Sequence, residues 1–219
     1  MSPLWTPSPE RAAKTELARF MKLAGQSSYA DLHRWSIEHS ADFWNAVWDF
    51  SAVRGEKGGE VVVDATRMPG AKWFPQARLN YAENVLRNRS SADAIVFWGE
   101  DRIKRRLSHK NLHALVSRIA RALSDAGVRK GDRVAGYLPN IPEATAALLA
   151  SASLGAVWSS CSPDFGVQGV LDRFGQIEPK VLFCADGYLY NGREFDSQEK
   201  ASQVLEQLPS VEECVVVDY

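Results

Sequence analysis

The chain has 219 residues, of which 45% are hydrophobic and 24% are charged, and its formal net charge is −1 at pH 7. This composition is typical of a globular protein in water, and the near-neutral charge gives no electrostatic basis for binding nucleic acid or an anionic membrane. No apolar run approaches the length of a membrane span, and the first residues lack the apolar core of a signal peptide. We therefore expect no nucleic-acid partner and no membrane partner.

The helices expected at the start of the chain are each preceded by a serine suited to the N-cap position: Ser8, Ser28 and Ser40. We expect the first of them to run on until Gly25 ends it. The run EVVVD at residues 60–64 is predicted to form a strand. Residues 1–90 are thus predicted to be a helical N-terminal cap with a connecting segment.

The chain from residue 91 onward is predicted to be α/β, with a mostly parallel sheet and crossover helices, because short apolar runs alternate with amphipathic segments. Before the sheet, residues 94–98 and 102–107 are predicted to form a hairpin whose second strand, RIKRRL, is basic like many exposed edge strands. Ser108 caps a long helix that Gly127 ends. Further strands are expected after Arg133 and at residues 156–160, 180–185 and 214–218, further helices at residues 141–154 and 167–176 and before Leu208, and a loop at residues 186–196.

The last strand suggests that the sequence is incomplete. Val215, Val216 and Val217 form a continuous apolar run, which is typical of a central parallel strand buried on both faces. A chain that stops on such a strand lacks the helix that would cover it. We therefore expect residues 91–219 to be an incomplete α/β portion of a larger domain.

The three cysteines, Cys161, Cys184 and Cys214, cannot all pair within one chain. Two of them lie in apolar, strand-like runs, where buried free thiols are common. They are too far apart in sequence for a zinc motif. We predict that all three are reduced and that the protein is cytoplasmic.

Several motifs resemble those of the acyl-adenylate-forming acyl-CoA synthetases, and the resemblance extends over nearly the whole chain. They are DFW at residues 42–44, WFP at 73–75, LNYAEN at 79–84, YLPNIPE at 137–143, LGAV at 154–157 and WSSCSPDFG at 158–166. The last of these most resembles the acetoacetyl-CoA synthetase branch. The resemblance implies an N-terminal portion of a ligase that uses ATP, Mg²⁺ and CoA to convert acetoacetate into acetoacetyl-CoA, with the remainder of the same polypeptide as its partner.

The same resemblance implies one cofactor-binding loop, formed by Tyr190, Asn191, Gly192 and Arg193. In related enzymes the corresponding loop uses two arginines to bind CoA. Here Arg193 matches the second arginine and would hold a CoA phosphate, whereas Tyr190 replaces the first and would stack on adenine or donate its hydroxyl. A glycine pair that these relatives carry in the preceding loop is also replaced, by Pro163 and Asp164. The alternative is that Arg193 is an ordinary surface arginine.

No catalytic or metal-binding residue is predicted in the chain, because it lacks the Ser/Thr/Gly-rich loop that surrounds ATP phosphates with backbone N–H groups. The serines Ser159, Ser160 and Ser162 are expected to cap the following helix or to line an acyl pocket. Glu143 is expected to complement a helix dipole. We expect the chain to be inactive alone. The alternatives are a ligase for acetate or another short acid and, in a different class, a non-catalytic module that binds CoA or a nucleotide.

Overall fold

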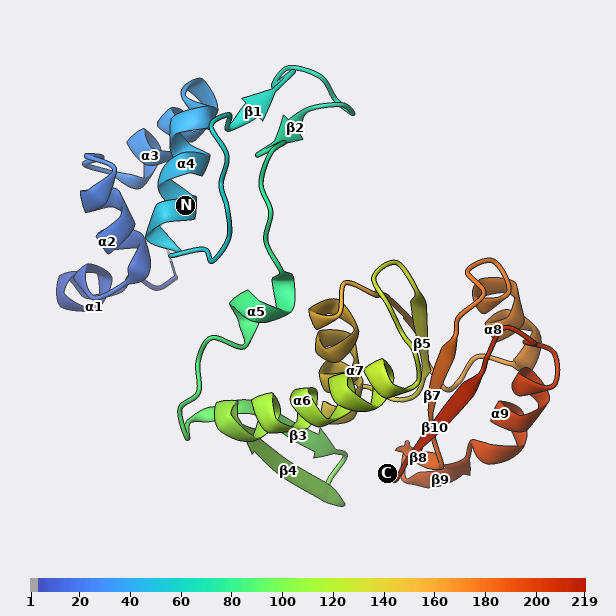
Figure 1. Ribbon diagram of the computed structural model, residues 1–219. Coiled ribbons are helices and arrows are strands. Elements are labelled where there is room, and N and C mark those ends of the chain that lie inside the picture. Colours follow the sequence, from blue (N-terminus) through green and yellow to red (C-terminus); the bar gives the residue numbers. More distant parts are fainter. Residues whose placement is uncertain (1–3) are drawn as a thin grey trace. The chain divides into compact units, whose positions relative to one another are not determined.

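The computed structural model describes residues 4–219, which form two compact units that divide between Leu79 and Asn80 (Figure 1). The first unit is mainly helical. The second is an α/β unit with a parallel sheet, which confirms the predicted fold class. Each unit is described separately below.

The first unit contains four helices and a short antiparallel strand pair within its described part: α1 (Pro9–Ala13), α2 (Glu16–Leu23), α3 (Tyr29–Glu38), α4 (Ser40–Phe50), β1 (Val62–Val63) and β2 (Lys72–Trp73). Aromatic rings form its small core. The buried Phe20 ring makes edge contacts with Phe43 and Phe50 of α4, at centroid distances of 5.8 and 5.1 Å. Edge-to-face contact suits the ring quadrupoles, so these pairs tie α2 to α4.

The single first helix predicted from the sequence is wrong, because the chain forms two helices there. Ser8 does cap α1, and its side chain accepts a hydrogen bond from the Arg11 N–H. The helix then ends, and the Thr15 side chain accepts from the Ala18 N–H to begin α2. A hydroxyl that satisfies a free N–H allows a new helix to begin within two residues of the previous one. The structure also differs from two smaller predictions, since His39 rather than Ser40 is the N-cap of α4 and the strand at 60–64 shrinks to β1.

The second unit is built from a hairpin, a four-stranded parallel sheet, a second hairpin and helices. In chain order these are α5 (Tyr81–Val85), β3 (Asp93–Gly99), β4 (Ile103–Ser108), α6 (His109–Asp125), β5 (Arg133–Tyr137), α7 (Pro142–Ser153), β6 (Val157–Cys161), α8 (Val167–Phe174), β7 (Val181–Ala185), β8 (Gly187–Tyr190), β9 (Arg193–Asp196), α9 (Gln198–Leu205) and β10 (Glu213–Val217). The parallel strands have the order β10-β7-β5-β6. The predicted crossover helices and the predicted first hairpin are confirmed.

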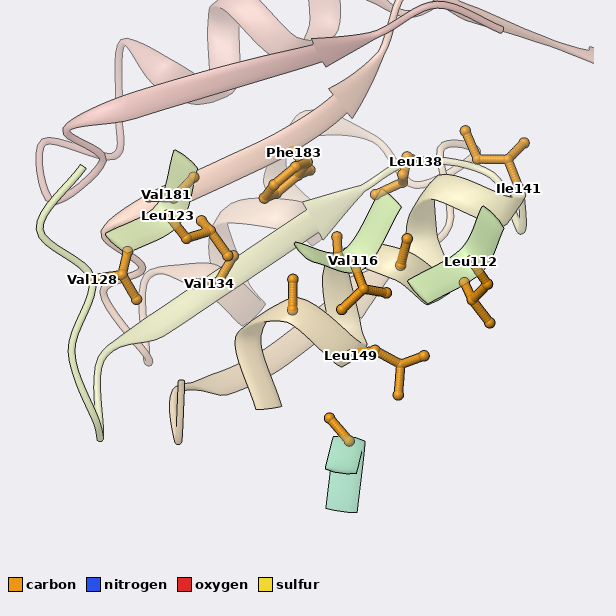
Figure 2. Close-up of a cluster of buried hydrophobic side chains, with 14 of the residues drawn as sticks. Leu112, Val116, Leu123, Val128, Val134, Leu138, Ile141, Leu149, Val181 and Phe183 are labelled. Atoms are coloured by element: carbon orange, nitrogen blue, oxygen red, sulfur yellow. The ribbon is translucent and has the colours of Figure 1, made fainter. Parts of the chain in front are cut away.

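The two faces of the sheet have separate cores because side chains alternate along each strand. On one face, Val134, Val181 and Phe183 pack against α6 and α7, and Figure 2 shows them in one cluster with Val116 and Leu123 of α6. On the other face, residues such as Tyr137 and Leu182 pack against α8 and α9. Figure 1 shows the same arrangement, with α6 and α7 on one side of the strands and α8 and α9 on the other. The sheet and the helices on its two faces therefore form three layers. The loops that follow the strands lie at the carboxyl ends of the sheet, where ligands bind in folds of this kind.

The last strand is an edge strand in the part of the chain that the structure describes, so its burial within the larger domain stays a prediction. β10 pairs with β7 alone, and Val216 is 58% exposed. β7, by contrast, has neighbours on both sides and is buried throughout. A run of valines gives a strand in either position, whereas burial depends on what lies beside it.

The predicted loop at residues 186–196 is instead a β-hairpin, formed by β8 and β9. Asn191 and Gly192 lie at its tip with φ values of 51° and 74°. Two consecutive positive φ angles are what a two-residue type I′ turn requires, and Asn-Gly is the dipeptide that favours them. The Asn191-Gly192 dipeptide is therefore the local sequence signal for this hairpin.

Candidate functional site

The loops at the carboxyl ends of the parallel strands form the candidate site. From β5 the chain crosses to β6 on one side, and from β6 it returns past β5 to β7 on the other. The chain thus leaves the adjacent strands β5 and β7 in opposite directions, and a ligand crevice is expected at such a switch point. The loop at 138–141 follows β5, the loop at 162–166 follows β6, and the second hairpin follows β7.

Tyr137, the last residue of β5, fixes the loop after β6. Its side chain is fully buried, and its hydroxyl lies 2.7 Å from the Phe165 carbonyl oxygen and 3.1 Å from the Pro163 carbonyl oxygen. Burial raises the pKa of Tyr137 to about 12, so the hydroxyl keeps its proton at neutral pH and remains a donor. The loop that carries Pro163 is thus held by the sheet itself.

A cavity of about 250 Å³ lies beside this loop, between the carboxyl ends of β5 and β6. Ser160 and Ser162 line it together with Asn140. The helix that follows, α8, begins after Gly166 and has no side-chain cap. The expectation that these serines cap that helix is therefore wrong, and two of them instead place hydroxyl groups in a small polar cavity.

The first hairpin is anchored to the start of α7 by a two-pronged ion pair. Both terminal nitrogens of the Arg105 guanidinium lie 2.9 Å from the two carboxylate oxygens of Glu143. The same guanidinium lies over the Phe97 ring, 5.2 Å from its centroid. The prediction that Glu143 serves the helix dipole thus missed its main partner, which lies 38 residues away in sequence. Paired, planar contacts of this kind are directional, so they orient the hairpin as well as attract it.

The basic strand β4 is largely neutralised by its neighbours. Besides Arg105, it carries Arg106, which pairs with Asp93, and Lys104, whose ammonium lies 4.5 Å from the centroid of the Trp98 ring. Each of the three basic side chains of the cluster thus has a partner within the second unit. The positive charges thus stabilise the pairing of the two hairpin strands and the contact of the hairpin with α7.

A larger groove of about 600 Å³ lies between the first hairpin, the start of α7 and the second hairpin. Its walls include Trp98, Asn140, Tyr190 and Tyr219. The tips of the two hairpins are joined, because the Gly192 N–H donates to a Glu100 carboxylate oxygen at 3.0 Å. These residues lie 92 positions apart, and no local pattern in the sequence indicates their contact. The joint gives the second hairpin a fixed position beside the groove.

The four residues predicted to bind CoA lie together at the tip of the second hairpin. Tyr190 ends β8 with its side chain 67% exposed, and it lines the groove. Arg193 begins β9 directly across the hairpin from Tyr190. The Arg193 side chain is exposed and makes no hydrogen bond or ion pair with any residue in the range 4–219, although its backbone pairs with Tyr190. The tip therefore presents a tyrosine ring and an unpaired cation next to each other.

The described residues form neither a cluster of metal-binding side chains nor a membrane-spanning helix. Residues 4–219 contain no group of three or more His, Cys, Asp or Glu side chains placed to bind a metal ion. No helix in that range combines the length and the apolar character needed to cross a lipid bilayer.

Comparison with known families identifies the second unit. Residues 82–219 match the model of the family described as AMP-binding enzyme. The chain belongs to the AMP-binding enzyme family. The match to this AMP-binding family includes the parallel sheet and both hairpins. Residues 29–85 also match the model described as the acetyl-coenzyme A synthetase N-terminus.

Relatives of this AMP-binding chain confirm the resemblance drawn from its motifs. It is 48% identical to an acetoacetyl-coenzyme A synthetase of Rhizobium meliloti, with 99% of this chain and 34% of the relative covered. It is 41% identical to an acetoacetyl-CoA synthetase of Macaca fascicularis, and the match covers 99% of this chain and 33% of that relative. The solved structure of the acetoacetyl-CoA synthetase of Streptomyces lividans superposes on this chain with a TM-score of 0.92 at 41% sequence identity. The superposition covers 100% of this chain and 35% of the Streptomyces chain. The chain thus spans about a third of the length of the relatives it matches.

Proposed function

We propose that the whole protein is an acid–thiol ligase that converts acetoacetate, ATP and CoA into acetoacetyl-CoA, AMP and pyrophosphate. The observation that supports this most strongly is the 48% identity to an acetoacetyl-coenzyme A synthetase over nearly the whole of this chain. A ligase of this kind works on small molecules and needs no nucleic acid or membrane, and its free cysteines suit the reducing cytoplasm.

Within that protein, we propose that residues 1–90 form the helical cap and residues 91–219 the first part of the large catalytic domain. ATP and Mg²⁺ receive no ligand here, because the described residues include neither a phosphate loop nor an acidic metal cluster. This segment therefore supports the fold of the catalytic domain and forms one side of a binding groove. The remainder of the polypeptide supplies the reacting groups.

The proposal is tested by measuring thioester formation with the whole protein. With ATP, Mg²⁺ and CoA, acetoacetate should give acetoacetyl-CoA with a kcat/KM at least about tenfold above those of acetate and propionate, a ratio that corresponds to about 1.4 kcal/mol of differential binding in the transition state. A higher kcat/KM for acetate would identify the protein as a sibling ligase. CoA binding without pyrophosphate release from any of these acids would identify a non-catalytic binding module.

We further propose that the tip of the second hairpin binds the nucleotide part of CoA. Arg193 offers an unpaired guanidinium for a phosphate, and phosphate is the ligand that the planar fork of arginine binds best. Tyr190 lies directly across the hairpin and offers a ring for the adenine, since aromatic side chains and bases stack readily. The joint between Gly192 and Glu100 keeps these groups in place before the ligand arrives, which lowers the entropy cost of binding.

Replacing Arg193 with alanine should raise the KM for CoA about tenfold, because a charge-assisted hydrogen bond contributes about 1.5 kcal/mol or more. The rate of acetoacetate-dependent ATP–pyrophosphate exchange should stay unchanged, since CoA takes no part in adenylate formation. Arg118→Ala, which removes an exposed arginine from α6, is the matched control and should leave both values unchanged. A fall in exchange with an unaltered KM for CoA would contradict the proposed role.

A further inference from the structure

Two thiols lie close together on neighbouring strands of the parallel sheet. Cys184 is on β7 and Cys214 is on β10, and their sulfur atoms are 3.7 Å apart. Cys214 lies opposite Leu182, two residues before Cys184 on the same strand, so the two cysteines are diagonal neighbours on one face of the sheet. They approach each other although 30 positions separate them in sequence.

The two thiols differ in their surroundings. Cys184 is buried, whereas Cys214 is partly exposed. The hydrogen bond between the two sulfur atoms lowers the pKa of Cys214 to about 7. The same hydrogen bond, followed by burial, raises the pKa of Cys184. Since burial disfavours a charged group, the thiolate forms on the more exposed sulfur, and Cys214 is the more nucleophilic of the pair.

The third cysteine provides a comparison within the same molecule. Cys161, at the end of β6, is buried, and burial raises its pKa to about 11. Neither of the other cysteines is hydrogen-bonded to it in the described structure. At neutral pH it is a protonated thiol without a nearby partner, so it should react slowly with oxidants.

We propose that Cys184 and Cys214 form a redox modification site, which a hydroperoxide converts reversibly into a disulfide between β7 and β10. In the first step the Cys214 thiolate attacks one oxygen of the hydroperoxide. The O–O bond breaks, a proton is taken up, and the products are a sulfenic acid on Cys214 and water or an alcohol. In the second step the Cys184 sulfur attacks the sulfenic acid, forms the S–S bond and releases the hydroxyl as water with the proton of the thiol. Overall, two thiols lose two electrons and two protons, which the hydroperoxide accepts.

The position of the pair makes the disulfide easy to reverse. Neighbouring parallel strands lie about 4.8 Å apart and rise about 3.3 Å per residue, so diagonal Cα atoms are about 8 Å apart. This exceeds the upper limit of about 7 Å for an unstrained disulfide. Closure therefore requires β10 to slide along β7, out of the register in which Cys214 lies opposite Leu182. A disulfide formed under such strain is readily reduced by other thiols, which suits a reversible modification better than a structural crosslink.

The test uses the folded whole protein treated with hydrogen peroxide at neutral pH, followed by alkylation and non-reducing peptide mapping. We expect a peptide pair linked through Cys184 and Cys214, its disappearance with dithiothreitol, and a loss of free Cys214 about tenfold or more faster than that of Cys161, because thiolate content governs the rate. Linkage through Cys161, oxidation of all three cysteines at similar rates, or oxidation of Cys214 to the sulfinic acid with Cys184 still free would each overturn the proposal.

Two variants distinguish a reacting pair from two adjacent but independent thiols. In Cys184→Ser, which keeps a hydrogen-bond donor beside Cys214 but cannot form a disulfide, dimedone should trap a sulfenic acid on Cys214. The unmodified protein should lose this sulfenic acid to disulfide formation. Cys161→Ala is the matched control and should form the linked peptide at the normal rate. Phenylarsine oxide, which needs two thiols within reach of one arsenic atom, should protect Cys184 and Cys214 of the unmodified protein from alkylation together. Protection of neither cysteine would contradict their proximity without relying on any variant.

Discussion

Residues 1–219 purified alone should show acetoacetate-dependent ATP–pyrophosphate exchange at a rate at least about a thousandfold below that of the whole protein. The expected loss is large because removing even one group that stabilises a transition-state charge lowers kcat by about 10²–10³. Adenylate formation needs backbone N–H groups around three phosphates, and the Ser/Thr/Gly-rich loop that would supply them is absent from these residues. The segment instead carries a hairpin tip, a groove and two packed cores. The measurement is incorporation of labelled pyrophosphate into ATP.

Two controls make this result interpretable. A cooperative thermal transition, followed by circular dichroism, would show that the segment is folded when assayed. The whole protein, assayed beside it with acetoacetate, would show that the substrate and conditions are suitable. Exchange by the segment within tenfold of the whole protein would contradict the prediction and would place a phosphate-binding site among these residues.

The substitution Phe174→Ala should lower the free energy of unfolding by about 3–5 kcal/mol, the cost typical of removing a buried phenylalanine ring. Phe174 is the last residue of α8, and its side chain is fully buried in the core between the sheet and the helices α8 and α9. Truncation leaves a cavity among Leu182, Val170 and Val204, which are themselves fully buried and cannot easily close it. Urea unfolding with a fluorescence readout measures the change.

Phe195→Ala is the matched control for this prediction. The Phe195 side chain is 37% exposed and stacks on the Tyr188 ring at a centroid distance of 5.0 Å. Its loss should cost about 1 kcal/mol, since only one aromatic pair and part of the ring burial are lost. Equal destabilisation by the two substitutions would show that the core of the α8–α9 face does not dominate stability.

Local sequence patterns were sufficient to predict most elements of the second unit. The alternation of apolar runs with amphipathic segments correctly placed β5, α7, β6, α8 and β7, and Ser108 correctly marked the start of α6. These signals work because side-chain periodicity and capping act over a few residues. Two of the errors, one in each unit, have clear local causes, since Thr15 begins a new helix and Asn191-Gly192 closes a hairpin.

The sequence alone also determined the family, through motifs such as WSSCSPDFG at residues 158–166. Only the tertiary structure decided how distant residues meet. It pairs Arg105 with Glu143, joins Gly192 to Glu100, and brings the sulfur atoms of Cys184 and Cys214 to 3.7 Å. It also decided that Val216 is exposed. These contacts join residues that are 30 to 92 positions apart in the sequence. They depend on the order of the strands and on how the hairpins pack, and the local preference of residues for helix or strand determines neither.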